Sequence, residues 1–167
     1  MPPSTIDLPV PAWIGLGANL GDARATLTAA LAALARLPDT TLRAASSIYR
    51  SAPVDSSGPD YLNAVAWLDT RLSPDALLAE LQRIELDHGR ERPYRNAPRT
   101  LDLDLLLHGQ ARIATPTLTL PHPRLHERAF VLRPLAELAP TLVVPGRGAV
   151  TDLLQVVVDQ RVDRLLA

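Results

Sequence analysis

The sequence predicts an α+β fold: a ferredoxin-like βαββαβ sandwich followed by additional C-terminal helices. Several short segments are apolar or β-branched, two intervening segments repeat apolar residues at helical spacing, and their order is strand, helix, strand, strand, helix, strand. With 167 residues and 47% apolar content, the chain is long enough for one sizeable core. We therefore expect a single domain over residues 1–167.

The first two elements follow an N-terminal segment, residues 1–11, which we expect to be irregular because it is rich in proline. Trp13–Asn19, WIGLGAN, is a short apolar run that leads into a glycine-containing turn, as is typical of a strand. Ala23–Leu37 then repeats leucine at helical spacing and ends before a proline. These residues predict a strand followed by a helix.

The middle of the chain predicts two strands and a second helix. Thr41–Arg50 and Tyr61–Thr70 are β-branched or aromatic runs, separated by a loop dense in Pro, Gly, Ser and Asp. Ser73 and Pro74 supply an N-cap and a proline at the first helical position, and Gly89 offers a C-terminal stop. The helix is therefore expected between Ser73 and Gly89.

The segment RTLDLDLLLHG, residues 99–109, predicts the fourth strand and contains an unusual pair of carboxylates. Side chains alternate along a strand, so one face carries Leu101, Leu103, Leu105 and Leu107. Asp102 and Asp104 share the other face, with Cα atoms roughly 7 Å apart, so both can reach one cation or a pair of cations. Alternatively, this face of the strand only contacts solvent. The residues near the two aspartates must distinguish a cation site from a solvated face. After this strand we expect a helix around Phe130–Leu138 and an apolar helix from about Val150.

Composition excludes several classes of protein. The formal net charge is −1, so the whole molecule has no general attraction to nucleic acid or an anionic membrane. The chain has no cysteine, which excludes disulfides and zinc-thiolate sites, and no lysine, which excludes a P-loop lysine. It has no signal-like leader and no apolar run of the ~18 residues that a membrane helix needs. We expect a cytoplasmic protein and a monomer.

Arginines gather beside the aspartate strand. The loop GRERPYRNAPR contributes four, at Arg90, Arg92, Arg95 and Arg99. A guanidinium fork suits phosphate oxygens, and arginines that face two carboxylates resemble the layout for metal-bound polyphosphate. Gln82 and Glu85, which precede the loop, are expected to share one helix face.

Several motifs in one order carry a family resemblance. GLGANLGD, YRSAPV with DYLNA, QRIE, GRER, PRTLDLDLLLHG and LPHPRLHERAFVLRPLAELAP resemble the 6-hydroxymethyl-7,8-dihydropterin pyrophosphokinase family over about residues 13–145. The resemblance implies a ferredoxin-like fold and Mg²⁺-dependent transfer of diphosphate from ATP to the pterin hydroxymethyl group, with AMP as the other product. ATP and the reduced hydroxymethylpterin are then the small-molecule partners.

The resemblance also assigns residues. Asp102 and Asp104 match the positions that hold two Mg²⁺ ions, and Arg90 and Arg92 match positions that act on the phosphates during transfer. The ATP site corresponds to Gln82, Glu85, Arg92, Arg99, Leu105, Thr119, His122 and Arg128. The pterin pocket corresponds to Gly17, Ser51, Pro53, Val54, Tyr61, Asn63 and Phe130, with Tyr61 and Phe130 as an aromatic sandwich. Asn96, Thr117 and Pro123 depart from the family pattern.

Three other functions stay open. A divergent paralogue is compatible with the three departures. A metal-dependent phosphohydrolase is compatible with Asp102, Asp104 and His122, which could activate water on a bound ion. A ferredoxin-like RNA-binding module is disfavoured, because an RNA-binding sheet needs exposed aromatic residues, and the chain has two Trp, three Tyr and one Phe.

Overall fold

The computed structural model describes residues 4–53, 58–88 and 101–165, and its centre is a mostly antiparallel sheet. The strand order is β10-β3-β4-β1-β5, and β2 also pairs with β4. The strands of this sheet are β1 (Thr5–Ala18), β2 (Thr40–Ala45), β3 (Tyr49–Ser51), β4 (Tyr61–Leu72), β5 (Asp102–His108) and β10 (Val162–Arg164). Two short hairpins complete the strands, formed by β6 (Ile113–Ala114) with β7 (Thr119–Leu120) and by β8 (Val143–Val144) with β9 (Gly148–Ala149).

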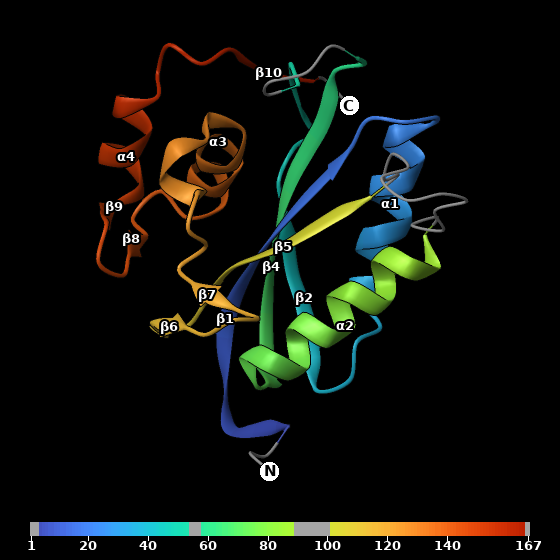
Figure 1. Cartoon of the computed structure of the whole chain (residues 1–167), viewed down its shortest axis with the longest axis vertical. Helices are drawn as coiled ribbons and strands as arrows, with labels where there is room; N and C mark the ends of the chain where they lie inside the picture. Colours follow the sequence, from blue (N-terminus) through green and yellow to red (C-terminus); the bar gives the residue numbers. More distant parts are fainter. Residues whose placement is uncertain (1–3, 54–57, 89–100, 166–167) are drawn as a thin grey trace.

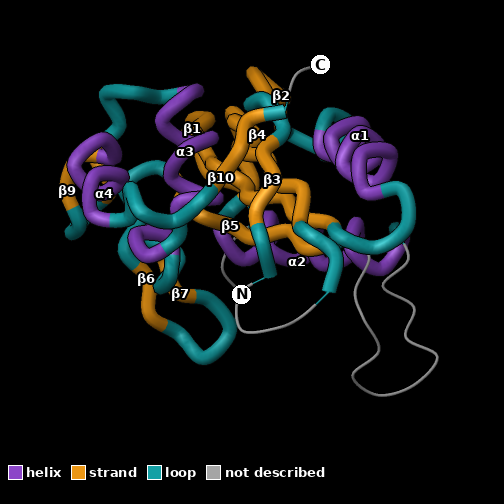
Figure 2. The backbone as a smooth tube through the Cα atoms, turned by 90° about the horizontal axis from the view of Figure 1, so that it is seen from above, coloured by secondary structure: helices purple, strands orange, loops and turns teal. Residues whose placement is uncertain are grey.

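Helices cover both faces of the sheet (Figures 1 and 2). On one face lie α1 (Ala23–Leu34) and α2 (Pro74–Asp87). On the other lie α3 (Ala129–Leu138) and α4 (Val150–Val156), with a short 3-10 helix at Leu125–Glu127 before α3. The chain is therefore a mixed α+β protein, as the sequence predicts. None of the helices in the described ranges has the length and apolar character needed to cross a membrane.

Both helices on the first face begin at a side-chain cap. The Asp22 carboxylate accepts a hydrogen bond from the Ala25 N–H, and the Ser73 hydroxyl accepts one from the Ala76 N–H. Pro74 occupies the first turn of α2, where its missing N–H costs no hydrogen bond. Local sequence thus fixes where both helices start.

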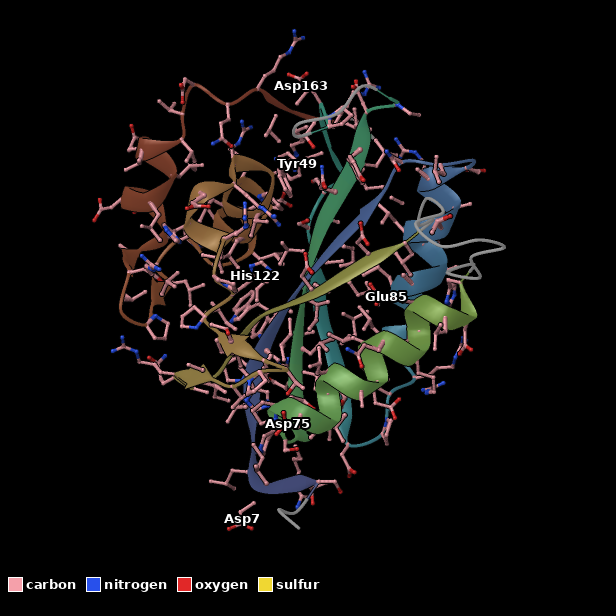
Figure 3. The ribbon with its side chains drawn as sticks, in the orientation of Figure 1. Asp7, Tyr49, Asp75, Glu85, His122 and Asp163 are labelled. Atoms are coloured by element: carbon pink, nitrogen blue, oxygen red, sulfur yellow. The ribbon has the colours of Figure 1, made fainter. Side chains whose placement is uncertain are left out.

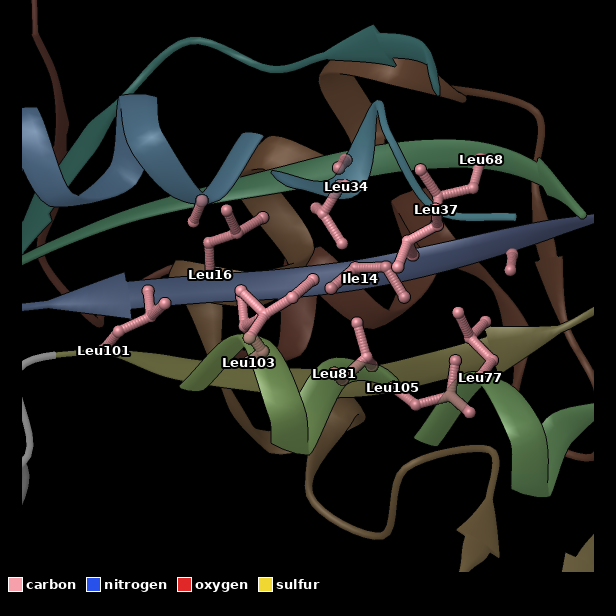
Figure 4. Close-up of a cluster of buried hydrophobic side chains, with 14 of the residues drawn as sticks. Ile14, Leu16, Leu34, Leu37, Leu68, Leu77, Leu81, Leu101, Leu103 and Leu105 are labelled. Atoms are coloured by element: carbon pink, nitrogen blue, oxygen red, sulfur yellow. The ribbon is translucent and has the colours of Figure 1, made fainter. Parts of the chain in front are cut away.

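The core has two parts, one on each side of the sheet. On the α1 and α2 side, Leu34 and Leu81 pack against Ile14 of β1 and Leu103 of β5 (Figure 4). On the α3 side, Leu132 and Leu135 pack with Trp13, Val65 and Leu106. Because β1, β4 and β5 contribute side chains to both parts, these three strands are the centre of the molecule.

Two predictions about strand limits were wrong. Strand β1 begins at Thr5, within the segment expected to be irregular, although its pairing with β4 shifts register between Thr5 and Val10. Proline supplies no N–H to a ladder, and this irregular register accommodates Pro9 without ending the strand. The single strand expected at Thr41–Arg50 is two strands, β2 and β3, with an interruption at residues 46–48.

The face expected for Leu107 was also wrong. Ile14 is paired with Leu105 and Trp13 with Leu107, so Leu106 is an extra residue in β5. This β-bulge reverses the alternation, and Leu107 packs on the α3 side while Leu101, Leu103 and Leu105 pack on the α2 side.

The packing of α2 generates a stability prediction with an internal control. Leu81 is fully buried, whereas Leu86 on the same helix is 59% exposed. Leu81→Ala should lower the free energy of unfolding by about 2–5 kcal/mol, because it removes buried methyl groups and leaves a cavity. Leu86→Ala should change it by less than about 0.5 kcal/mol. Urea unfolding of both variants checks this, and equal effects would contradict the core described here.

Candidate active site

Asp102 and Asp104 lie on one face of β5, opposite the leucines that pack on α2. Both carboxylates belong to half-buried residues, and the Asp104 side chain is 43% exposed. On the neighbouring strand β1, Gly17 is the partner of Asp102 and Gly15 is the partner of Asp104. Because residues paired across strands share a face, the two glycines leave space directly beside the two carboxylates.

This space is part of a cavity of about 330 Å³ between the sheet and the start of α3. A Cβ on Gly17 would lie 3.5 Å from Asn63 Oδ1, so a larger side chain there would fill the floor of the cavity. The polar and aromatic lining comes from Ser51, Tyr61, Asn63, Asp102, Asp104, Arg128 and Phe130. The cavity therefore combines an open floor, two carboxylates and two aromatic rings.

A buried hydrogen bond lies at the end of this cavity. Asn63 Nδ2 donates to Ser51 Oγ at 2.7 Å, and both residues are less than 10% exposed. The Asn63 amide oxygen and the Ser51 hydroxyl proton supply an acceptor and a donor of the kind that orients a heterocyclic ring. On the opposite wall, the Arg128 guanidinium lies 5.4 Å from the centre of the Phe130 ring, a cation-π distance that orients both side chains.

A second cavity of about 260 Å³ lies on the other side of Asp104. Its lining comes from β5, from the segment that joins β6 to β7, and from Leu78 of α2. The residues are Leu78, Leu103, Asp104, Leu105, Thr115, Pro116, Thr117, Leu118, Thr119, His122 and Pro123. Asp104 lines both cavities, so this carboxylate lies at the boundary between two potential ligand sites.

His122, labelled in Figure 3, is the neighbour of Asp104 at this boundary. Its Nε2 lies 4.0 Å from Asp104 Oδ1. Burial lowers the pKa of His122 below its ordinary value, and Arg128 and Arg124 lower it further, although the Asp104 carboxylate opposes this. His122 Nδ1 accepts a hydrogen bond from the Arg124 N–H at 3.1 Å. The neutral ring therefore carries its proton on Nε2, the nitrogen nearer Asp104.

Glu85, labelled in Figure 3, belongs to α2 and so lies on the face of the sheet opposite the one that carries Asp102 and Asp104. It is only 5% exposed, and its Oε2 accepts a hydrogen bond from the Leu103 N–H at 2.9 Å. Leu103 is the residue between the two aspartates, so this bond anchors the backbone that carries them. Gln82 was expected to share a face with Glu85, but Gln82 is exposed whereas Glu85 is buried. Residues three apart point about 60° away from each other around a helix, and this offset takes Gln82 out of the face that packs on the sheet.

The donor set fits a hard divalent cation. Carboxylate oxygens are the ligands that Mg²⁺ prefers, and Mg²⁺ is commonly held by one or two carboxylates together with substrate phosphates. Across residues 4–53, 58–88 and 101–165 there is no group of three or more His, Cys, Asp or Glu that could hold a metal alone. Asp102 and Asp104 could therefore supply protein ligands to such a cation.

The structure brings together most of the described residues that the sequence assigned to the site. The first cavity contains Gly17, Ser51, Tyr61, Asn63, Asp102, Asp104, Arg128 and Phe130. The second contains Asp104, Leu105, Thr119 and His122. Neither cavity is lined by Gln82, Glu85 or Pro53. The expected site residues Val54, Arg90, Arg92 and Arg99 lie outside the described residues, as does Asn96.

Sequence reasoning missed several residues of the site. Gly15 was not singled out, although its alternation with Gly17 in the segment GLG is a readable sign of a strand face without side chains. Ala52, Val65 and Val131 line the first cavity through tertiary packing, for which the sequence carries no local signal.

Comparison with known proteins identifies relatives over nearly the whole chain. Residues 13–140 match the family model of 7,8-dihydro-6-hydroxymethylpterin-pyrophosphokinase (HPPK). The chain is 45% identical over 157 residues to a 2-amino-4-hydroxy-6-hydroxymethyldihydropteridine pyrophosphokinase of Haemophilus influenzae, covering 93% of this chain and 98% of the relative. The enzyme of the same name from Pseudomonas aeruginosa is 46% identical over 154 residues, with 92% and 95% covered.

A solved structure shares the fold of this chain. A crystal structure of a Plasmodium falciparum HPPK-DHPS protein superposes with a TM-score of 0.72 at 14% identity, covering 92% of this chain. This chain spans 46% of that longer protein. The structural likeness concerns the fold, and the family model and the two bacterial relatives establish the sequence relationship. The chain belongs to the 7,8-dihydro-6-hydroxymethylpterin-pyrophosphokinase family.

Proposed function

We propose that this chain catalyses the reaction in its family's name, the transfer of a pyrophosphoryl group to 6-hydroxymethyl-7,8-dihydropterin, a step of folate biosynthesis. ATP is the proposed donor, and AMP is the other product. One observation carries the proposal: Asp104 lies at the boundary of two cavities, and its neighbour Asp102 lines the first. A phosphoryl-transfer enzyme needs two substrates that meet at a point of charge neutralisation.

The first cavity is the proposed pterin site. A flat bicyclic ring can stack on Tyr61 and Phe130, while the Asn63 amide and the Ser51 hydroxyl bind its polar edge. Gly17 leaves the floor open for the ring. Pro53 and Val54 belong to this proposed site by the family pattern.

The second cavity is the proposed nucleotide site, with Leu105, Thr119 and His122 in its lining. The triphosphate would extend from this cavity toward Asp104, where the neutral His122 ring can donate from Nε2 and Arg128 can donate from its guanidinium. The family pattern adds Gln82, Glu85, Arg92 and Arg99 to this site, and Arg90 and Arg92 as catalytic groups.

Asp102 and Asp104 are the proposed ligands of two Mg²⁺ ions. When bound, these ions would neutralise the charge of the phosphates and of the two carboxylates. MgATP would bring phosphate ligands to complete the coordination.

Residues of the chain position the two substrates, and none of them acts as the nucleophile. The hydroxymethyl oxygen of the pterin attacks the β-phosphorus of ATP, and the bond from that phosphorus to the oxygen bridging to the α-phosphorus breaks. AMP leaves with that electron pair, and the hydroxyl proton is released to solvent. The pterin cavity holds the hydroxyl in line, while Arg128 and His122 hold phosphate oxygens in a site partly shielded from water.

Finer structural and cellular features belong to the same proposal. The strand order β5-β1-β4 with β2 and β3 beside β4, and α1 and α2 on one face, supports a ferredoxin-like layout. We further propose that residues 1–167 act as a single domain, as a monomer in the cytoplasm, with no nucleic-acid or membrane partner.

The carboxylate pair generates the first functional prediction. Asp102→Asn and Asp104→Asn should each abolish detectable AMP formation from ATP and hydroxymethyldihydropterin, because the amide cannot supply the negative charge that binds the cations. AMP measured by chromatography, with and without the pterin, tests this. Asp152→Asn, an exposed residue of α4, is the control and should retain wild-type activity.

Two outcomes of that assay would overturn the proposal. Near-native turnover in either aspartate variant would exclude the metal site. Wild-type hydrolysis of ATP that does not depend on the pterin would instead favour the phosphohydrolase alternative.

The aromatic walls generate the second prediction. Tyr61→Ala and Phe130→Ala should each weaken binding of a pterin analogue by about 1–3 kcal/mol, the free energy of covering one ring face. Affinity of Tyr61→Ala for an ATP analogue should stay within twofold, since Tyr61 does not line the second cavity. Isothermal titration calorimetry measures both affinities, and unchanged pterin binding in both variants would contradict the sandwich.

Glu85 generates the third prediction. Glu85→Ala should lower the free energy of unfolding by about 1–3 kcal/mol, because it leaves the buried Leu103 N–H without its acceptor. Glu80→Ala, which removes a half-buried carboxylate of the same helix that pairs with the exposed Arg83, is the control and should cost less than about 1 kcal/mol. Urea unfolding checks both, and equal costs would show that the Glu85 carboxylate does not anchor β5.

A further inference from the structure

The connection between β2 and β3 contains a one-residue bulge that decides which side chains reach the pterin cavity. Ala45 is paired with Ala66 of β4, and Tyr49 is paired with Asn63. Three residues, 46–48, therefore lie opposite two residues of β4, 64–65. An extra residue in one strand reverses the facing of every residue after it.

The consequence for the cavity is specific. In an unbulged strand, Ile48 would lie opposite Asn63 and Arg50 opposite Tyr61. With the bulge, Tyr49 and Ser51 occupy these positions, and both are buried at 3% and 7% exposure. The bulge thus turns the Ser51 hydroxyl, rather than the Arg50 guanidinium, toward Asn63 and the cavity.

A bulge frees backbone groups from the ladder, and a carboxylate on α3 binds the freed donor. Both oxygens of Glu137 accept from the Ser47 N–H, at 3.0 and 3.2 Å, and Oε2 also accepts from Ser47 Oγ at 3.2 Å. Tyr49 Oη donates to Glu137 Oε1 at 2.6 Å. Arg164 of β10 lies 4.0 Å from Oε2. One side chain from α3 therefore contacts the bulge, β3 and β10 (Tyr49 is labelled in Figure 3).

The charge on Glu137 is well stabilised. Burial by itself raises the pKa of this carboxyl, but the hydrogen bonds from Tyr49 and Ser47 outweigh it, so the pKa lies below its ordinary value. Burial, together with the same hydrogen bond, raises the pKa of Tyr49 to about 12. Glu137 is ionised and Tyr49 is neutral throughout the physiological range, which keeps these charge-assisted hydrogen bonds intact.

Other contacts hold the rest of the bulge. Ser46 N–H donates to the Val65 carbonyl, and the Val65 N–H donates to Ser46 Oγ, both at 2.9 Å. The Ile48 carbonyl accepts from the Leu165 N–H at 2.8 Å. The Ser47 N–H is the backbone donor in this segment that depends on a side chain of α3.

We propose that Glu137 is a positioning residue for the pterin site, which fixes the bulge at residues 46–48 and thereby keeps Ser51 turned into the cavity. Glu137 does not line the cavity, so it acts through β3 and not on the substrate directly. The inference rests on the proposed function in assigning the first cavity to the pterin. It adds that α3 sets two walls of that cavity, one through Phe130 and the other through Glu137 and β3.

The test compares Glu137→Ala, Glu137→Gln and Tyr49→Phe with wild type. Glu137→Ala should raise the dissociation constant of a pterin analogue at least tenfold, measured by calorimetry with a saturating non-hydrolysable ATP analogue. The dissociation constant of the ATP analogue itself should change less than twofold. Glu137→Gln keeps an acceptor for the Ser47 N–H. Its increase in the logarithm of the pterin dissociation constant should therefore be at most half of the increase in Glu137→Ala. Glu80→Gln, at a half-buried ion-pair residue of α2 that lines neither cavity, is the control and should bind both ligands as wild type does.

Hydrogen exchange supplies a readout that needs no substrate. In Glu137→Ala the Ser47 amide should exchange at least tenfold faster than in wild type, while the Leu103 amide, bonded to Glu85, should keep its rate. If Glu137→Ala does not fold, Tyr49→Phe takes its place, with an expected twofold to fivefold loss of pterin affinity and no change for ATP.

These measurements distinguish a failure of the positioning role of Glu137 from a failure of the proposed function. Unchanged pterin affinity, or an equal loss for both ligands, would overturn the positioning role. If wild type neither binds the pterin nor forms AMP, the proposed function fails. Nuclear Overhauser contacts to Asn63 then still test the positioning role. Glu137→Ala, or Tyr49→Phe if Glu137→Ala does not fold, should weaken the contacts from Ser51, and contacts unchanged from wild type would overturn the role.

Discussion

The alternation of side chains along β5 is the constraint on which the rest of the structure depends. Leu103 and Leu105 must face α2 to complete the core, and this forces Asp102 and Asp104 onto the opposite face. Two like charges this close are unfavourable unless the space beside them admits a cation or polar ligands. Glycine at positions 15 and 17 of β1 supplies that space, so the same pairing that builds the sheet also opens the site.

Carboxylates from helices on both faces of the sheet hold strand backbone near this site, one of them buried (Glu85) and the other at the surface (Glu137). Glu85 of α2 accepts from the Leu103 N–H, and Glu137 of α3 accepts from the Ser47 N–H. Each helix thus fixes the backbone of a strand that carries site residues, β5 in one case and β3 in the other. The pKa of Glu137 lies below its ordinary value, and hydrogen bonds to an ionised acceptor are stronger than neutral ones, which suits a segment that must hold a side chain in one direction. The polar residues around the site therefore divide into those that line the cavities and those that orient the lining.

Local sequence signals predicted the helices and most strands well, but they did not predict the β-bulges. The cap at Ser73, the leucine spacing of α1 and α2, and the alternation around Asp102 and Asp104 are all short-range patterns, and the structure confirms them. The bulges at Leu106 and at residues 46–48 depend on how one strand pairs with another, so the sequence of a single strand does not reveal them. Strand β10 and the contacts of Glu137 were missed for the same reason, because residues more than 80 positions apart meet only in the folded chain.

In the function proposed above, Asp102 and Asp104 bring a cation to the boundary between the nucleotide and the pterin. Paramagnetic broadening tests it most directly, with Mn²⁺ in place of Mg²⁺, a non-hydrolysable ATP analogue and a pterin analogue bound to ¹⁵N-labelled protein. The amide resonances of residues 102–105 and the protons of the bound pterin should broaden together, and an equal concentration of Mg²⁺ should broaden neither. Broadening centred on another segment, with residues 102–105 and the pterin unaffected, would contradict the claim.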